Sequence, residues 1–160
     1  MSLKRISTAL SLLGMLAACG GPGADAEVPE AQPAGATMVD IGDYVVHFNA
    51  QATDQLPPEV ASAYSISRSK NRAMLTVSII RESDGLSVTG NVSVDTVNLT
   101  GQMKNVTMRQ IDEPGDPPAI YYIGTTQIAN RETLNFDISV TPDGASRPSQ
   151  VRFQRQFYTD

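Results

Sequence analysis

Residues 133–141, TLNFDISVT, alternate polar and apolar side chains without a break. Neighbouring side chains of an extended chain point to opposite faces of a sheet, so this period of two predicts a half-buried β-strand. The side chains expected to face the core are Leu134, Phe136, Ile138 and Val140. Those expected to face water are Asn135, Asp137 and Ser139. Phe136 is therefore predicted to be a buried core residue.

Similar alternation continues on both sides of this strand. Further strands are expected at residues 44–50, 74–80, 88–94, 106–108, 120–128 and 151–157. Asp84-Gly85 predicts a tight hairpin between the second and third of these, because both central positions of a type I′ turn need φ > 0. Asp143-Gly144 marks another turn. The fold class is thus all-β, with roughly seven strands as in an immunoglobulin-like β-sandwich, and an open barrel is the alternative.

Length and charge limit the classes of function. The 160 residues, 41% of them hydrophobic, suit one folded domain. Acidic residues outnumber basic ones 17 to 12, and without Lys4 and Arg5, which lie in a segment expected to be removed, the balance is 10 minus 17, or −7. Nucleic-acid binding needs clustered Lys and Arg, so we expect no nucleic-acid partner. The same balance disfavours adhesion to anionic lipid headgroups.

The start of the chain predicts export and a lipid anchor. Lys4 and Arg5 precede an uncharged, mostly apolar stretch, residues 6–18, which is typical of a secretory signal and too short to span a bilayer. It ends in Leu16-Ala17-Ala18-Cys19, which resembles the bacterial lipobox. The resemblance implies a signal peptide of residues 1–18, cleavage after Ala18 and lipidation of Cys19. An ordinary signal peptide that leaves Cys19 as a free thiol is the alternative.

The lipid on Cys19 would attach the protein to a membrane. Gly20 follows the cysteine, where Asp in many Gram-negative bacteria holds a lipoprotein at the inner membrane, so the resemblance favours the periplasmic face of the outer membrane. Residues 19–38 comprise the lipidated Cys19 and a segment rich in Gly, Ala and Pro, which we expect to be a flexible linker. The β-sandwich domain is then expected over residues 39–160.

Several segments of this domain carry a family resemblance. They are GDYVVHFNA (42–50), LPPEVA (56–61), RSKNRA (68–73), NLTGQMK (98–104), AIYYIG (119–124) and TLNFDI (133–138). Together they resemble a family of small Gram-negative bacterial lipoproteins that is classed as domain of unknown function 4426. The family has no assigned chemistry, so the resemblance implies no catalytic residue.

The residue types needed for catalysis are sparse. His47 is the only histidine, so no relay of Ser, His and Asp can be built with a second choice of base. We therefore expect no enzyme activity and no cofactor. His47 with Met74, Met103 and Met108 could make a soft site for Cu(I), which raises the alternative of a periplasmic copper chaperone or binding protein. Because single, scattered methionines more often fill gaps in a core, no metal site is predicted.

One region of the domain departs from the strand pattern and carries clustered charge. Arg68, Lys70 and Arg72 have i, i+2, i+4 spacing, which on an extended chain places all three charges on one face. Shortly before them, residues 56–61 break the alternation, and Pro58 suits the first position of a short helical turn. Such charges more often form a solvated face than a binding site.

Binding residues concentrate in loops that a rigid scaffold holds, so we take this region as the candidate interaction surface. Its residues are Leu56, Pro57, Pro58, Arg68, Lys70 and Arg72. The sequence thus favours a noncatalytic accessory or protein-interaction domain, anchored to the outer membrane, with an envelope protein as its partner. A metal chaperone is the second hypothesis and a hydrolase the third.

Replacing Cys19 with Ser should yield a full-length, poorly processed precursor without acyl lipid, because the thioether to the diacylglyceryl group needs the cysteine sulfur. Metabolic labelling with a fatty-acid analogue, compared with the wild-type chain, measures this. Label retained on the Ser variant would show that the anchor lies elsewhere.

Overall fold

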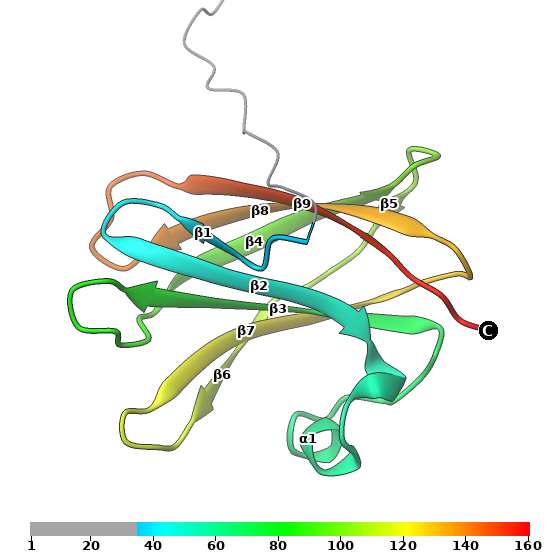
Figure 1. Ribbon diagram of the computed structural model, residues 1–160, viewed down its shortest axis with the longest axis horizontal. Helices are drawn as coiled ribbons and strands as arrows, with labels where there is room; N and C mark the ends of the chain where they lie inside the picture. The colour runs from blue at the N-terminus through cyan, green and yellow to red at the C-terminus, as the bar shows by residue number, and fades with distance from the viewer. Residues whose placement is uncertain (1–34) are drawn as a thin grey trace, which may run out of the picture.

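Nine strands form two antiparallel sheets within residues 35–160, the part of the chain that the computed structural model describes (Figure 1). One sheet has the order β1-β2-β3-β7-β6 and the other the order β5-β4-β8-β9. The first consists of β1 (Met38–Asp40), β2 (Tyr44–Ala52), β3 (Arg72–Arg81), β7 (Ala119–Gln127) and β6 (Arg109–Glu113). The second consists of β5 (Met103–Lys104), β4 (Gly90–Asn98), β8 (Thr133–Pro142) and β9 (Ser149–Gln156).

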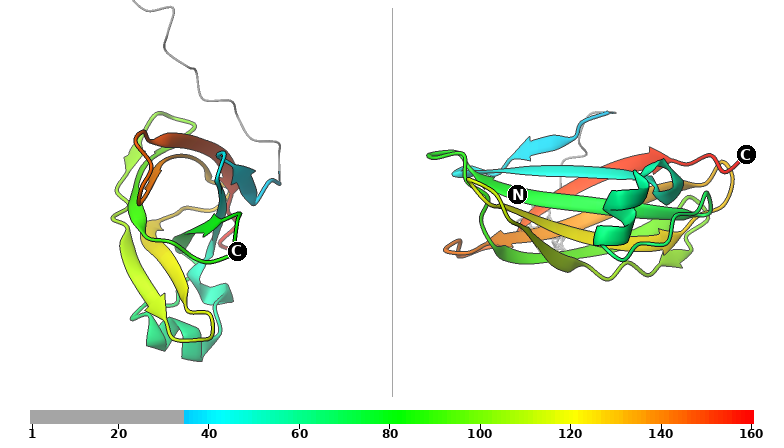
Figure 2. Two further views of the ribbon diagram at one scale, coloured as in Figure 1. Left: turned by 90° about the vertical axis from the view of Figure 1, so that its left-hand side faces the viewer. Right: turned by 90° about the horizontal axis from the view of Figure 1, so that it is seen from below.

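The strand order is that of an immunoglobulin-like sandwich. Strands β2, β3, β7 and β6 take the places of A, B, E and D, and strands β4, β8 and β9 take those of C, F and G. The predicted fold class is therefore confirmed, as two packed sheets, which Figure 2 shows from the end and from below. Three of the nine strands lie outside the expected ranges. β1 and β5, of three and two residues, are too short to show an alternating pattern, and β6 follows the segment where a strand was expected at residues 106–108.

The core lies between the sheets and follows the alternation of β8. Leu134, Ile138 and Val140 are 0% exposed and Phe136 is 1% exposed, as predicted. The Phe136 ring stacks on Phe153 of β9, with ring centroids 4.8 Å apart and an interplanar angle of 12°. The other sheet contributes side chains from β2 and β3, among them Val46, Phe48, Leu75, Val77 and Ile79.

The hairpin expected at Asp84-Gly85 is only partly formed. Gly85 does turn the chain with φ +69°, and a single bridge joins Ile80 to Ser87. The chain then leaves the first sheet, and β4 pairs with β8 in the second sheet rather than with β3. The prediction that residues 88–94 would continue a hairpin with residues 74–80 was therefore wrong.

Gly90 explains where the chain crosses between the sheets. A Cβ on this residue would lie 2.5 Å from the Thr141 carbonyl oxygen, so only glycine allows β4 to approach β8 this closely. The Gly90 N–H donates to Tyr122 Oη over 2.8 Å, from the opposite sheet. Burial raises the pKa of Tyr122 above its ordinary value, so the hydroxyl stays neutral and donates in turn to Gln110 (3.2 Å).

The strand expected at Val106 and Met108 was also misplaced. These residues lie in the connection that crosses from β5 to β6, and β6 begins at Arg109. Their side chains are apolar because they pack against Gly124 of β7, where an added Cβ would lie 2.7 Å from Val106 Cγ1 and 2.8 Å from Met108 Sδ. The alternation of apolar residues at 106 and 108 therefore reflects the packing of an irregular segment and not a strand.

At the N-terminal side, β1 begins at Met38, one residue before the expected start of the domain. The predicted signal peptide, Cys19 and the linker up to residue 34 lie outside the described residues. Within residues 35–160, no helix has the length and apolar character needed to cross a membrane.

Replacing Phe136 with Ala should lower the free energy of unfolding by about 3–5 kcal/mol, through lost transfer energy and the cavity left behind. Asp137→Ala should change it by only about 0.5 kcal/mol, because Asp137 forms a partly exposed ion pair with Arg152 across the strands, and such pairs contribute little. Urea denaturation measures both. Comparable losses in the two variants would contradict the assignment of the faces.

Candidate functional site

The connection from β2 to β3 folds back over the outer face of the five-stranded sheet and forms a flap, residues 53–71 (Figure 2). It contains a 3-10 turn, η1 (Thr53–Gln55), and a short helix, α1 (Pro58–Ala63). Pro58 occupies the first position of α1, as predicted, where the missing N–H costs no hydrogen bond. Ser65 follows with φ +53° and reverses the chain toward β3.

A second, smaller hydrophobic cluster fixes the flap to the sheet. Leu56 and Ala61 of the flap pack on Met74 of β3 and Ile123 of β7, and all four are buried. Met74 therefore fills a cluster on the outer face of the sheet, not the core between the sheets. Burying a side chain such as Leu56 contributes about 1.5–3 kcal/mol toward holding the flap on the sheet.

Thr53 closes the base of the flap. Its side chain is 0% exposed, and its hydroxyl accepts a hydrogen bond from the Ser69 N–H at 2.9 Å. The same hydroxyl lies 3.0 Å from the Ser67 carbonyl oxygen and 3.1 Å from that of Ser69, and donates its proton within this pair. One buried side chain thus joins the two ends of the flap.

The three basic residues of the candidate surface do not share one face. Arg68 turns back and donates from Nη2 to the Asp54 carbonyl oxygen at 2.6 Å. Lys70 is exposed in a turn, and Arg72 lies on β3 with Nη1 3.4 Å from Thr125 Oγ1. The prediction of a single extended face was wrong because the chain turns at residues 70–71. Of the other predicted surface residues, Leu56 is buried, while Pro57 and Pro58 are exposed.

A cavity of about 190 Å³ lies between the flap and the sheet. Arg72 lines it, and so does Arg109 of β6, whose Nη2 donates to the Tyr64 carbonyl oxygen. Sequence reasoning missed Arg109, because only the order β3-β7-β6 brings a residue so distant in the chain beside the flap. No local pattern around Arg109 signals this position.

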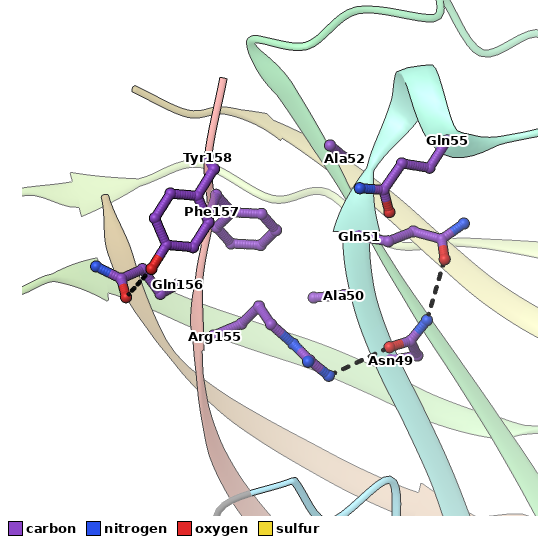
Figure 3. A pocket seen from close by; sticks show the side chains of 9 residues that line it. All are labelled: Asn49, Ala50, Gln51, Ala52, Gln55, Arg155, Gln156, Phe157 and Tyr158. Carbon is purple, nitrogen blue, oxygen red and sulfur yellow. Dashed lines mark hydrogen bonds between the residues drawn. The ribbon is translucent and has the colours of Figure 1, made fainter. Parts of the chain in front are cut away.

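A second hollow, of about 310 Å³, lies at the edge of the sandwich between β2 and β9 (Figure 3). Side-chain amides and an exposed tyrosine dominate its lining: Asn49, Gln51, Gln55, Gln156 and Tyr158. Gln55 belongs to η1, so the hollow adjoins the base of the flap. These amide and hydroxyl groups both donate and accept hydrogen bonds, and Arg155 is the one charged side chain among the lining residues.

Arg155 crosses this hollow from β9 toward β2 (Figure 3). Its Nη2 reaches Asn49 Oδ1 at 3.4 Å, and its buried Nε has no hydrogen-bond partner in the described part of the chain. The Arg155 side chain thus joins β9 to β2 across the hollow.

The hollow also lies along two incompletely paired strand edges. Pairing of β1 with β2 ends at the Met38–His47 pair, followed by one bond from the Phe48 N–H to the Thr37 carbonyl oxygen. Within residues 35–160, no strand pairs with residues 49–52 of β2 on this side, and β9 is the last strand of its sheet. Unpaired strand edges expose backbone donors and acceptors that can pair with another chain.

The four residues considered for copper are dispersed. His47 is exposed on the outer face of β2, and Met74 is buried under the flap. Met103 is exposed on β5 of the other sheet, and Met108 packs against the core. Among residues 35–160, no group of three or more His, Cys, Asp or Glu side chains is arranged to hold a metal ion.

An immunoglobulin-like β-sandwich with a flap packed on one outer face thus defines the class of this protein. Residues 38–160 match the family model for a domain of unknown function, DUF4426, and the chain belongs to that family. It is similar to a crystal structure of a DUF4426 family protein from Pseudomonas aeruginosa PAO1, with 31% sequence identity and a TM-score of 0.66. The similarity covers 77% of this chain and 94% of the other. A comparison with curated proteins gave no match.

Proposed function

We propose that the protein is a lipoprotein anchored to the periplasmic face of the outer membrane, and that its sandwich is a noncatalytic interaction domain for another envelope protein. The lipobox at Leu16–Cys19 and the following Gly20 support the anchor and its membrane. The lipid on Cys19 provides the membrane contact, and the net acidic chain gives nucleic acid no basic stripe to bind.

The observation that carries this proposal is the amide-lined hollow between β2 and β9. An extended segment of a partner can add to an exposed strand edge through main-chain hydrogen bonds, while side-chain pockets supply selectivity. Residues 49–52 of β2 offer such an edge, and Gln51, Gln55 and Gln156 lie where partner backbone or amide groups would bind. Arg155 adds a cationic side chain to the lining of the same hollow.

The flap extends the proposed surface beyond the hollow. Pro57, Pro58 and Lys70 are exposed on it, while Thr53 and Leu56 hold its base in place. A rigid, exposed loop costs little ordering entropy when it binds, so it favours recognition of a partner. Equilibrium dialysis with Cu(I) tests the alternative of a periplasmic copper chaperone. Stoichiometric binding of Cu(I) would support that alternative.

A photo-crosslinking amino acid at Gln51 or Gln55 should capture an envelope protein in intact cells, because both positions line the hollow. The same amino acid at Asn91 or Asp95, exposed on the outer face of β4, should capture far less. Mass spectrometry of the crosslinked bands measures the difference.

Matched positions make this experiment decisive. The same discrete band from Gln51 and Gln55, and its absence from Asn91 and Asp95, would support the hollow as the docking site. Equal capture from all four positions, or capture from β4 alone, would contradict it.

A further inference from the structure

The cavity under the flap has a chemistry of its own. In the described part of the chain, the side-chain ion pairs join Arg81 to Asp84, Lys104 to Glu132 and Arg152 to Asp137. Arg72 and Arg109 take no part in these pairs, although the whole chain carries a net charge of −5. Within residues 35–160, the two guanidinium groups that line this small cavity thus form no ion pair with a carboxylate.

The sheet register places both arginines on the same face. Arg72 pairs in register with Gln127 of β7, and Arg109 pairs with Ile123 of the same strand. Ile123 belongs to the cluster on the outer face, and residues 123 and 127 of a strand point to the same side. The two side chains therefore flank β7 on the face that the flap covers.

The guanidinium groups are oriented by the protein but keep free donors. Arg72 donates from Nη1 to Thr125 Oγ1 at 3.4 Å. The Gln127 amide is oriented so that its nitrogen donates to the Asn71 carbonyl oxygen, and its oxygen then accepts from Arg72 Nη2 at 3.1 Å. Arg109 uses Nη2 for the Tyr64 carbonyl oxygen. A guanidinium has five N–H donors, so each arginine keeps donors for a ligand.

The rest of the lining adds hydroxyl donors and no negative charge. Ser65, Ser67, Thr107 and Thr125 line the cavity, and no Asp or Glu is among its lining residues. A single guanidinium can satisfy a carboxylate by a bidentate contact, whereas two guanidinium groups with surrounding hydroxyls match the higher charge and tetrahedral oxygens of a phosphate.

We propose that this cavity binds a phosphate group, either as the free ion or as part of a phosphorylated ligand or lipid headgroup. Arg72 and Arg109 supply the charge, and the hydroxyls of Ser67 and Thr125 supply further donors. The volume of about 190 Å³ accommodates the group together with a short attached segment. The proposal is independent of the partner docking at the β2–β9 hollow, because the lining of the two sites shares no residue.

The test is isothermal titration of the full chain, purified from cell envelopes in a non-ionic detergent, with inorganic phosphate at constant ionic strength. We expect saturable binding of one phosphate per chain. Arg72→Gln should weaken it by about tenfold or more, since charge-assisted hydrogen bonds are the strong ones. The charge-matched control, Arg147→Gln, removes an exposed arginine outside the cavity and should bind as the wild type does.

A second pair of variants separates binding from folding. Arg109→Gln also removes the contact to Tyr64, so its thermal unfolding is measured alongside binding. Thr125→Val keeps both arginines and should weaken phosphate binding without lowering the unfolding temperature by more than a few degrees. Weaker binding in Thr125→Val and Arg72→Gln with an intact fold would support the site.

Three results would overturn the proposal. These are the absence of saturable heat with wild-type protein, unchanged binding in Arg72→Gln, and acetate binding as tightly as phosphate, which would indicate a carboxylate site. Titration with a soluble short-chain phosphatidic acid distinguishes the sources of the phosphate. Tighter binding of this lipid than of inorganic phosphate would support a headgroup, and equal binding would support the free ion.

Discussion

The five-stranded sheet carries apolar side chains on both of its faces, and this constraint shapes everything outside the main core. Its inner face packs against the second sheet through Leu75, Val77 and Ile79. Its outer face carries Met74 and Ile123, which would otherwise be exposed to water. Covering such a face is favourable by about 25 cal/mol for each Å² of apolar surface removed from water. The flap provides that cover, and its position fixes both candidate sites.

Few contacts hold the flap over the outer face of the five-stranded sheet. One buried hydroxyl, that of Thr53, joins the two ends of the flap, and Leu56 anchors the flap to the sheet.

Glu132 is a similar side-chain anchor at the same end of the second sheet. There, burial would raise the pKa of Glu132, but hydrogen bonds from Lys104, Asn98 and the Ala129 N–H outweigh it and lower the pKa. That carboxylate therefore stabilises the fold at neutral pH, and its contribution declines in acid as it becomes protonated.

Local alternation was sufficient to predict the strands of the core, because burial on one face imposes a period of two on each of them. The same alternation was sufficient to predict the burial of Phe136, and the fold class that follows from about seven such strands. It failed wherever the deciding contact is distant in the chain. Met74 alternates like a solvent-facing residue yet is buried by the flap, and the crossing at Gly90 depends on close approach to Thr141.

In the candidate sites, too, local sequence patterns predict some features, while others depend on contacts between residues that are distant in the chain. The flap region was predicted because prolines and clustered charges interrupt the strand pattern, yet the grouping of Arg72 with Arg109 needs the order of three strands. The hollow of Figure 3 likewise forms from β2 and the C-terminal segment, which are distant in the sequence. Arg155 and Gln156 carry no local signal of a site, because β9 reads simply as the last alternating strand.

Native-state hydrogen exchange of a Thr53→Val variant tests most directly whether this hydroxyl holds the flap as a unit separate from the main core. The amides to follow are those of Leu56, Ala61 and Ile66, which are hydrogen-bonded within the flap. They should lose protection together while the amides of β8 keep theirs, and Thr141→Val on the outer face of β8 should change neither set. Unchanged protection of the flap amides in Thr53→Val, or an equal loss in β8, would contradict the account.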